Sequence, residues 1–209
     1  VYNTSIMETT MKAAVVRGPG KIPVFDDFQD PQAAGNAVVL DVMAAALSHV
    51  SRSRASGTHY STDNSFPFVP GVDGVGRLAD GRRVYFLAPE HPFGSMAQKA
   101  LVEKSHCIPL PDDLDDVTAA ALAVPGMSSW AALTERARLV KGETVLINGA
   151  TGAAGKLAVQ IAKHLGAGKV IATGRNVDLL EQLSDLGADM VLPLGALGNT
   201  FEASVRPVF

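Results

Sequence analysis

A glycine-rich stretch, Gly149–Gly155, has the residue types and spacing of a phosphate-binding turn. It follows the short apolar run Val145–Ile147 and opens an amphipathic segment over residues 156–165. Glycines leave the backbone bare, so a pyrophosphate can approach it, and the N-terminus of the following helix offers unpaired N–H groups and a partial positive charge. We therefore expect phosphate contacts from Gly149, Ala150, Thr151, Gly152, Ala153, Ala154, Gly155 and Lys156, although Lys156 also fits a simple surface lysine.

A second segment, Thr173–Asn176, indicates which dinucleotide is bound. Folds specific for NAD place an acidic residue about 20 residues after the glycine turn, where it holds the ribose hydroxyls. Here Gly174 occupies that position and Arg175 follows it. A guanidinium is a charge-assisted, often bidentate partner for a 2′-phosphate. Gly174, Arg175 and Asn176 are therefore predicted to bind NADPH; the alternative is that Arg175 is a solvated residue in a strand–helix turn.

The elements that must position these residues follow a β-α-β-α-β pattern after Lys141. Helices are expected over residues 156–165, stopped by Gly166, and from the cap Asn176 to Leu186, stopped by Gly187. Strands are expected at 145–147, 170–173 and 190–192. The pattern stops near Gly195, so it predicts only the first half of a doubly wound sheet, in the order 3-2-1. Pro193 then falls in an edge strand, where proline is tolerated.

The chain before Pro125 has a different pattern, in which short apolar runs alternate with turn residues. This alternation of apolar runs and turn residues predicts a β-rich domain of short strands, including 38–42, 83–87 and 96–102. Asp115 or Asp116 is expected to cap a helix that reaches Val124. A second helix is expected from Ser129 to Ala137.

Length and composition restrict the class of protein. The chain has 209 residues, of which 47% are hydrophobic, which is typical of a globular protein. Its net charge is −3, so it lacks the excess of basic residues that nucleic-acid-binding proteins carry. The single cysteine excludes an intrachain disulfide framework and fits a reducing, cytoplasmic compartment. No apolar run approaches the roughly 20 residues that span a bilayer, so we expect no membrane partner. Residues 1–10 are expected to be an extension or tag.

The ordered set of motifs resembles the medium-chain dehydrogenase/reductase superfamily, in its zinc-free quinone oxidoreductase branch. Besides the glycine-rich turn, the resemblance rests on Pro67–Gly76, Gly81–Tyr85, Gly94–Ala97 and Pro125–Trp130. It implies an α/β fold with a β-rich domain: a GroES-like domain over residues 11–128, then an NADP-binding Rossmann domain over 129–209 that is represented by its first three-strand half. It also implies an active site in the cleft between the two domains.

The residues do not fit a zinc site. Zinc-dependent relatives carry a Gly-His-Glu segment early in the chain, which reads Gly71–Asp73 here. A catalytic zinc needs about three protein ligands. The five histidines are scattered without ligand spacing, so no metal is expected.

The resemblance also suggests candidate catalytic residues. Tyr60 is similar to a tyrosine that many relatives place near the substrate, and Ser48 stands where many have an asparagine beside the nicotinamide. Ser128 matches a position near the nicotinamide that is usually threonine. The structural alternatives are a packed loop tyrosine for Tyr60 and helix capping for Ser128.

The function implied is hydride transfer from NADPH to quinones or α,β-unsaturated carbonyls, with Tyr60 or water as the proton source. One alternative is a non-catalytic, crystallin-like protein that binds NADPH or RNA. A third interpretation is an inactive, truncated form of the reductase that binds NADPH poorly, because the strand beyond the switch point is absent. The homodimer of the family is made by the last Rossmann strand, so the resemblance does not carry that dimer over to this chain.

Overall fold

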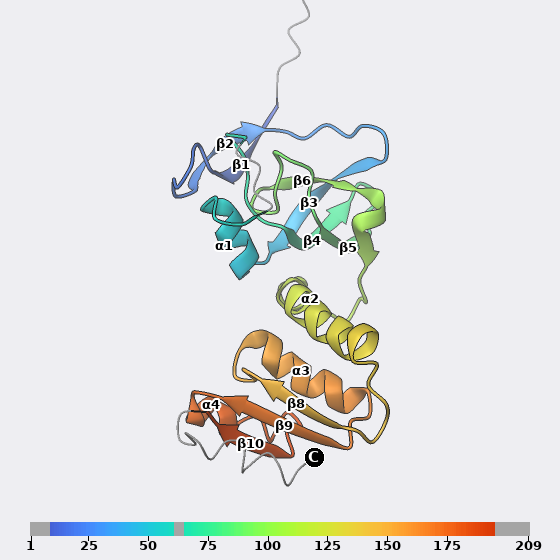
Figure 1. The fold of residues 1–209 in the computed structure, drawn as a ribbon. Helices are drawn as coiled ribbons and strands as arrows, with labels where there is room; N and C mark the ends of the chain where they lie inside the picture. Colours follow the sequence, from blue (N-terminus) through green and yellow to red (C-terminus); the bar gives the residue numbers. More distant parts are fainter. Residues whose placement is uncertain (1–8, 61–64, 195–209) are drawn as a thin grey trace, which may run out of the picture. The chain divides into compact units, whose positions relative to one another are not determined.

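The computed structural model describes residues 9–60 and 65–194 of the chain, which divides into two compact units, Val1–Leu122 and Ala123–Phe209. Figure 1 shows the fold of each unit. The division falls inside helix α2 (Asp116–Ala131), and the domain boundary predicted after Ser128 lies in the same helix and stays a prediction. Residues 1–8 of the expected extension and the segment from Gly195 to Phe209 lie outside the described residues.

In its described residues, 9–60 and 65–122, the N-terminal unit contains two antiparallel sheets. Strands β1 (Thr10–Val15) and β2 (Val24–Gln29) pair with each other. The larger sheet has five strands in the order β6-β3-β4-β5-β7. Its bounds are β3 Ala37–Ala45, β4 Asp73–Leu78, β5 Arg83–Leu87, β6 Lys99–Glu103 and β7 Cys107–Pro109. A short helix, α1 (His49–Ala55), follows β3, and a 3₁₀ turn, Lys104–His106, precedes β7.

Alternating apolar residues place two small cores in this unit. One lies on the larger sheet and includes Leu40, Val84, Phe86, Ala100 and Val102, all of them buried. The other consists of Met11, Ala13, Val15, Phe28 and Val69. The strands predicted at 38–42 and 83–87 are confirmed by β3 and β5.

The strand predicted to begin at Met96 begins later, at Lys99. The N–H group of Met96 donates to the carbonyl oxygen of Pro70 (3.0 Å), and Ala97 forms an isolated bridge with Ala13. These residues are therefore extended, as the apolar alternation indicated, but their partners lie outside the five-stranded sheet.

One continuous helix, α2, takes the place of the two helices predicted for this part of the chain. Asp115 caps it as predicted, because its Oδ1 accepts a hydrogen bond from the N–H of Thr118 (2.9 Å). The break expected at Pro125 is wrong: α2 continues through Pro125 to Ala131 and runs into a π-helical turn, Ala132–Arg136. Proline deprives the carbonyl of residue 121 of its donor. Ala121 is exposed, so water can hydrate that carbonyl and the helix need not stop.

By length and composition alone, one helical stretch among the described residues is long and apolar enough to cross a membrane: Asp116–Arg136, with a mean hydropathy of 1.3. It is not the continuous apolar run sought in the sequence, because it includes Asp116, Glu135 and Arg136. The carboxylate of Asp116 pairs with the guanidinium of Arg83 on β5 (2.7 Å). A single helix that passes this test is weak support for a membrane span.

The C-terminal unit is a parallel sheet with helices between its strands. Its elements are β8 (Thr144–Asn148), α3 (Ala153–His164), β9 (Lys169–Gly174), α4 (Val177–Glu181) and β10 (Met190–Pro193). The order β10-β9-β8 confirms the predicted 3-2-1 half-sheet, and Pro193 lies in edge strand β10 as predicted. Among the described residues, β8 pairs only with β9.

The core of this unit lies between the helices and the sheet. Its members include Ile147, Val159, Val170, Leu180 and Leu183. Helix α3 ends as predicted at Gly166, which has a φ of +92°. Helix α4 is shorter than predicted, because after Glu181 the chain tightens into successive i→i+3 turns. These turns keep Leu180 and Leu183 buried while bringing the chain to Gly187.

Candidate nucleotide-binding site

The segment Gly149–Lys156, which we call the phosphate turn, connects β8 to α3 at the carboxyl end of β8. Gly149 has a φ of +73°, a region that side chains with a Cβ rarely adopt. Ala150 is fully buried, and its N–H donates to the carbonyl oxygen of Thr173 on β9 (2.8 Å). This hydrogen bond therefore holds the phosphate turn at the carboxyl end of the neighbouring strand, β9.

Close packing explains the glycine at the end of the turn. A Cβ on Gly155 would lie 2.5 Å from the Cα of Ala150 and 2.5 Å from the carbonyl oxygen of Gly149. Both neighbours are backbone atoms, so they cannot yield as a flexible side chain can. Gly155 thus lets the first turn of α3 pack directly on the phosphate turn, which is the role of the third glycine in dinucleotide-binding motifs.

The first turn of α3 presents free donors. Gly152 is the N-cap, and the first helical bond runs from the N–H of Lys156 to the carbonyl of Gly152 (2.9 Å). In the described part of the chain, the N–H groups of Ala153, Ala154 and Gly155 have no hydrogen-bond acceptor. Three unpaired N–H groups at the positive end of a twelve-residue helix form an anion-binding arrangement.

The end of β9 lies against the phosphate turn. A Cβ on Gly174 would come within 2.8 Å of the Cγ2 of Thr151. Packing alone therefore disfavours the acidic side chain that NAD-specific folds carry at this position. The predicted residues Gly149–Lys156 and Gly174–Asn176 are thus brought together at the carboxyl ends of two adjacent strands.

The two residues after Gly174 have separate environments. Arg175 is exposed, and its guanidinium has no hydrogen bond or ion pair to any described residue. The side chain of Asn176 accepts a hydrogen bond from the N–H of Leu179 (3.1 Å) and so caps α4, as predicted. The side-chain oxygen of Asn176 is thus engaged within α4, and its role in cofactor binding stays a prediction.

Helix α2 reaches the phosphate turn through a residue that the sequence analysis missed. Ser128 is exposed and donates to the carbonyl of Pro125 in its own helix (3.0 Å). The hydroxyl of its neighbour Ser129 is also within hydrogen-bond distance of the Pro125 carbonyl (3.3 Å), and at 3.0 Å it reaches the carbonyl of Ala154, in the first turn of α3. The Cβ position of Gly126 lies 3.8 Å from Leu157. The hydroxyl that joins the two helices is thus that of Ser129, which the motif comparison passed over.

The candidate catalytic residues, Ser48 and Tyr60, belong to the N-terminal unit. Ser48 is the N-cap of α1, where its hydroxyl accepts from the N–H of Ser51 (3.2 Å). Tyr60 is 94% exposed, and its ring lies beside that of His59 with centroids 4.3 Å apart. Tyr60 is therefore not the packed loop tyrosine of the structural alternative. The catalytic roles of both residues stay predictions.

A buried polar pair in the same unit was also missed. Asp73, at the start of β4, is 1% exposed, and its Oδ2 accepts a hydrogen bond from the hydroxyl of Tyr85 (3.0 Å). Its Oδ1 is buried without a partner. Burial raises the pKa of the Asp73 carboxyl, and the bond from Tyr85 offsets part of that rise. The charged form of Asp73 is thus disfavoured inside the fold.

The described ranges, 9–60 and 65–194, contain no group of three or more His, Cys, Asp or Glu side chains arranged to hold a metal ion. Asp73 stands at the third position of the segment that reads Gly-His-Glu in zinc-dependent relatives, but its carboxylate is bonded to a tyrosine hydroxyl.

No family model matches the chain. The 2-methylene-furan-3-one reductase of Solanum lycopersicum is 34% identical over 78% of this chain and 46% of that protein. The chloroplastic NADPH-dependent alkenal/one oxidoreductase of Arabidopsis thaliana is 31% identical over 87% of this chain and 52% of that protein. The solved quinone oxidoreductase of Thermus thermophilus is 32% identical, with a TM-score of 0.82, over 93% of this chain and 63% of that one. The chain spans about half the length of the curated relatives it matches.

Proposed function

Because this chain belongs to the medium-chain dehydrogenase/reductase superfamily, in its quinone oxidoreductase branch, we propose that it binds NADPH and serves the reduction of quinones or α,β-unsaturated carbonyls. The observation that carries the proposal is the junction of the phosphate turn with Gly174–Arg175. Three unpaired N–H groups and one unpaired guanidinium lie at the ends of adjacent strands. The names of the two plant enzymes, an alkenal/one oxidoreductase and a furanone reductase, support the same substrate class.

The phosphate turn fits the diphosphate of this cofactor. Gly155 leaves no Cβ between helix and turn, and the N–H groups of Ala153–Gly155 point to an acceptor that the described protein does not supply. We assign the pyrophosphate to these N–H groups and the 2′-phosphate to Arg175. A Cβ at position 174 would press against Thr151, so an acidic residue is disfavoured there. The site therefore lacks the carboxylate that would repel a 2′-phosphate. NADPH, when bound, supplies the hydride.

The residues of the N-terminal unit would act on the acceptor. Hydride addition to an enone or quinone leaves negative charge on its oxygen, which needs a donor. We propose that the exposed hydroxyl of Tyr60, or water, donates this proton and that Ser48 lies on the nicotinamide side. We also propose that the reaction needs no zinc. The hydrogen bond from Tyr85 to Asp73 supports a zinc-free reaction, because Asp73 lies in the segment that carries the Gly-His-Glu motif in zinc-dependent relatives.

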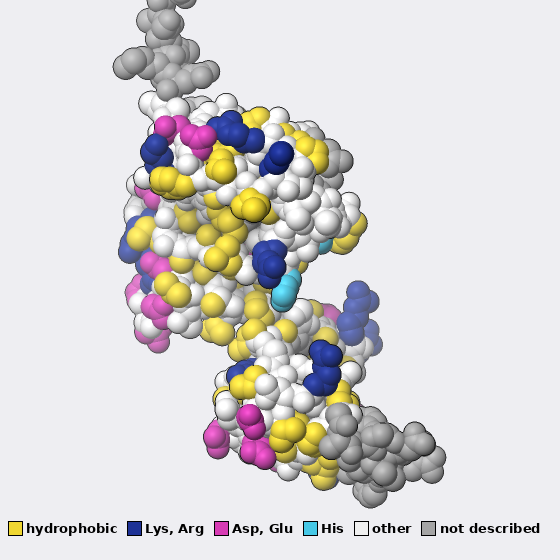
Figure 2. Space-filling view, turned by 90° about the vertical axis from the view of Figure 1, so that its left-hand side faces the viewer, with side chains coloured by type: hydrophobic (Ala, Val, Ile, Leu, Met, Phe, Trp, Pro, Cys, Tyr) yellow, Lys and Arg dark blue, Asp and Glu magenta, His cyan; other side chains and the backbone are white. Residues whose placement is uncertain are grey.

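The proposed partner is a small molecule. On the face drawn in Figure 2, lysines and arginines are scattered among acidic and apolar side chains, which supports a small-molecule partner over nucleic acid. The ion pair that Asp116 makes with Arg83 supports a non-membrane role for α2. We propose a cytoplasmic location, which the single cysteine supports.

The test is a comparison of NADPH and NADH binding to the 209-residue chain and to two variants. Arg175→Asp should weaken NADPH at least about tenfold while changing NADH by less than about threefold, since a charge-assisted bond contributes about 1.5–3 kcal/mol. Arg136→Gln removes an exposed arginine from the same unit and should change neither. Equal loss of NADPH and NADH binding in Arg175→Asp would contradict the assignment of the 2′-phosphate.

Activity is tested separately, by NADPH consumption with a panel of quinones and enones. Turnover with at least one acceptor is the result that the proposed function predicts. Tyr60→Phe should then lower kcat without changing NADPH affinity. Binding of NADPH without turnover of any acceptor would remove the reductase proposal and leave a nucleotide-binding protein.

A further inference from the structure

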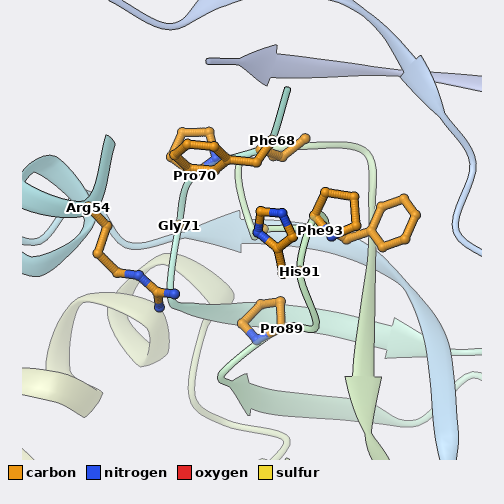
Figure 3. A pocket seen from close by; sticks show the side chains of 10 residues that line it. Arg54, Phe68, Pro70, Gly71, Pro89, His91 and Phe93 are labelled. Carbon is orange, nitrogen blue, oxygen red and sulfur yellow. The ribbon is translucent and has the colours of Figure 1, made fainter. Parts of the chain in front are cut away.

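The N-terminal unit contains a small pocket of about 110 Å³ that the proposed function does not use. Figure 3 shows the side chains around it. The pocket is built from three separate segments: Arg54 on α1, the segment Phe68–Gly71, and residues of the segment Pro89–Gly94. We call it the Arg54 pocket. All three segments belong to the same compact unit.

The walls of the Arg54 pocket are held in place by direct backbone contacts. The N–H of Val69 donates to the carbonyl of Pro92 (2.9 Å). A Cβ on Gly94 would lie 2.1 Å from the carbonyl oxygen of Val69, so the two segments are in van der Waals contact through their backbones. The rings of Pro70, Pro89 and Pro92 add rigid apolar surface. The pocket is therefore preformed, which lowers the entropy cost of binding.

The guanidinium of Arg54 is the unusual group in this pocket. It reaches from α1 toward the Gly71 segment (Figure 3) and is half-buried, yet it has no hydrogen bond or ion pair to a described residue. Four other arginines of this unit have acceptors among the described residues: Arg17, Arg77, Arg82 and Arg83. Arg52 has none either, but it is exposed to solvent, which can hydrate its guanidinium. Arg54 therefore presents donors that the described protein leaves unused.

The charge balance of the pocket favours an anion. No aspartate or glutamate is among its lining residues in the described ranges. A guanidinium presents a planar fork of donors that matches a carboxylate in a bidentate arrangement. His91 also lines the pocket. The proline and phenylalanine rings offer apolar surface to a carbon chain, which a small carboxylate has and an inorganic phosphate ion lacks.

We propose that the Arg54 pocket binds a small carboxylate, with the carboxyl group on the guanidinium and a short apolar body against the proline and phenylalanine rings. The volume sets the size, because drug-sized ligands occupy pockets of about 300–1,000 Å³. A carboxylate of about two to four carbons is the class that fits. The binding is a property of the N-terminal unit and does not depend on NADPH.

The probe is propionate, with propionamide as a neutral molecule of the same shape. At constant ionic strength, amide chemical shifts of the chain are followed while each probe is added. We expect saturable shifts centred on residues 52–55, 68–71 and 89–94 with propionate, and at least about tenfold weaker binding of propionamide, because a hydrogen bond to a charged group is lost. Equal binding of the two probes, or no binding of propionate, would overturn the proposal.

Two variants of α1 provide the matched test. Arg54→Gln should weaken propionate at least about tenfold, since it removes the charged fork. Arg52→Gln removes an exposed arginine two positions earlier on the same helix and should change propionate binding by less than about twofold. Arg54→Lys keeps the charge without the fork and should give an intermediate affinity. Equal effects of Arg54→Gln and Arg52→Gln would show a general charge effect and overturn the site.

Two further measurements separate the outcomes. Inorganic phosphate should bind more weakly than propionate; tighter binding of phosphate would overturn the assignment to a carboxylate. NADPH affinity should be the same in Arg54→Gln and the parent chain, so a failure at the Arg54 pocket leaves the proposed cofactor site standing. An unchanged amide spectrum away from α1 confirms that Arg54→Gln is folded.

Discussion

The phosphate turn and the Arg54 pocket, the two anion sites that we propose, are built from different parts of the polypeptide. The phosphate turn offers backbone N–H groups from one continuous segment, and its shape depends on glycines whose Cβ positions are occupied by other atoms. The Arg54 pocket offers one side chain, placed by segments that are far apart in the sequence. A site made by local backbone geometry can therefore be predicted from a sequence motif, whereas a site made by one side chain and distant segments cannot.

The largest expected effect of a single substitution is at Gly155. Gly155→Ala places a Cβ 2.5 Å from the Cα of Ala150, so helix α3 must move away from the turn. We expect the free energy of unfolding to fall by about 3 kcal/mol and nucleotide binding to be lost, because overpacking against backbone is not relieved by rotamer changes. Chemical denaturation and NADPH titration measure the two quantities.

Gly152→Ala is the matched control in the same turn. Its Cβ would lie 3.9 Å from the nearest neighbouring atom, the carbonyl oxygen of Gly149, and its backbone is extended. We expect a loss of less than about 1 kcal/mol, as for other weak N-caps. If both alanine variants were equally stable, the turn would not depend on the close packing of its backbone.

A smaller effect is expected at the contact between Gly174 and Thr151. Gly174→Asp should destabilise the chain by about 2 kcal/mol, since its Cβ meets the Cγ2 of Thr151 at 2.8 Å. Thr151→Ser removes that methyl group. In the double variant, we expect about 1 kcal/mol of the loss to be recovered, which a double-mutant cycle of unfolding free energies measures.

The same cycle tests why the acidic residue is absent. If Gly174→Asp were harmless to stability and only weakened NADPH, charge rather than packing would account for the glycine. A full loss of stability that Thr151→Ser does not relieve would mean that another contact, such as that with Leu180 at 3.3 Å, is the limiting one.

The smallest effect is a difference in pH dependence between the two units. Burial raises the pKa of Asp73 in the N-terminal unit above its ordinary value of 3.8. The neutral carboxyl therefore stabilises the fold fully below pH 3.8, and this stabilisation is lost as the pH rises through the pKa that Asp73 has in the folded protein. Asp189, in the C-terminal unit, has the opposite shift: its hydrogen bond with Lys163 lowers its pKa. Its contribution is present above pH 3.8 and is lost as the pH falls through its folded value.

Asp73→Asn and Asp189→Asn should therefore change stability with opposite slopes. Relative to the parent chain, Asp73→Asn should gain stability as the pH rises above 3.8, whereas Asp189→Asn should lose stability as the pH rises toward 3.8 from below. Urea denaturation at a series of pH values gives both differences. Slopes of the same sign would mean that Asp73 is not desolvated in solution as it is in the fold.

The parts of the fold that were predicted correctly are those with local sequence rules. The order β10-β9-β8, the cap at Asn176 and the stop at Gly166 each follow from a periodicity or a capping residue. The errors have physical causes. Two helices were expected, one that reaches Val124 and one that begins at Ser129, but Ala121, whose carbonyl loses its donor to Pro125, is exposed, so the helix can continue. Helix α4 is shorter than predicted because Leu180 and Leu183 stay buried in the tighter turns that follow it.

The site was predicted to a similar extent. The spacing along the chain predicted that the phosphate turn and the Gly174–Arg175 pair lie together, which the structure shows, and their role in binding NADPH stays a prediction. Ser129, Asp73 and Arg54 were missed, because their roles depend on contacts between separate segments. The bond from Tyr85 to Asp73 spans 12 positions, and that from Ser129 to Ala154 spans 25. An unpaired buried oxygen or a half-buried arginine without an acceptor becomes visible only once those segments are packed.

The measurement that tests the central claim most directly is an amide chemical-shift titration of the 209-residue chain with adenosine 2′,5′-bisphosphate, the part of NADPH that carries the 2′-phosphate. The predicted result is saturable binding with the largest shifts at Thr151–Lys156 and Gly174–Asn176, and weaker binding of adenosine 5′-monophosphate. Shifts of similar size throughout the chain, or equal affinity for both ligands, would contradict the claim that the phosphate turn and Arg175 form one NADPH site.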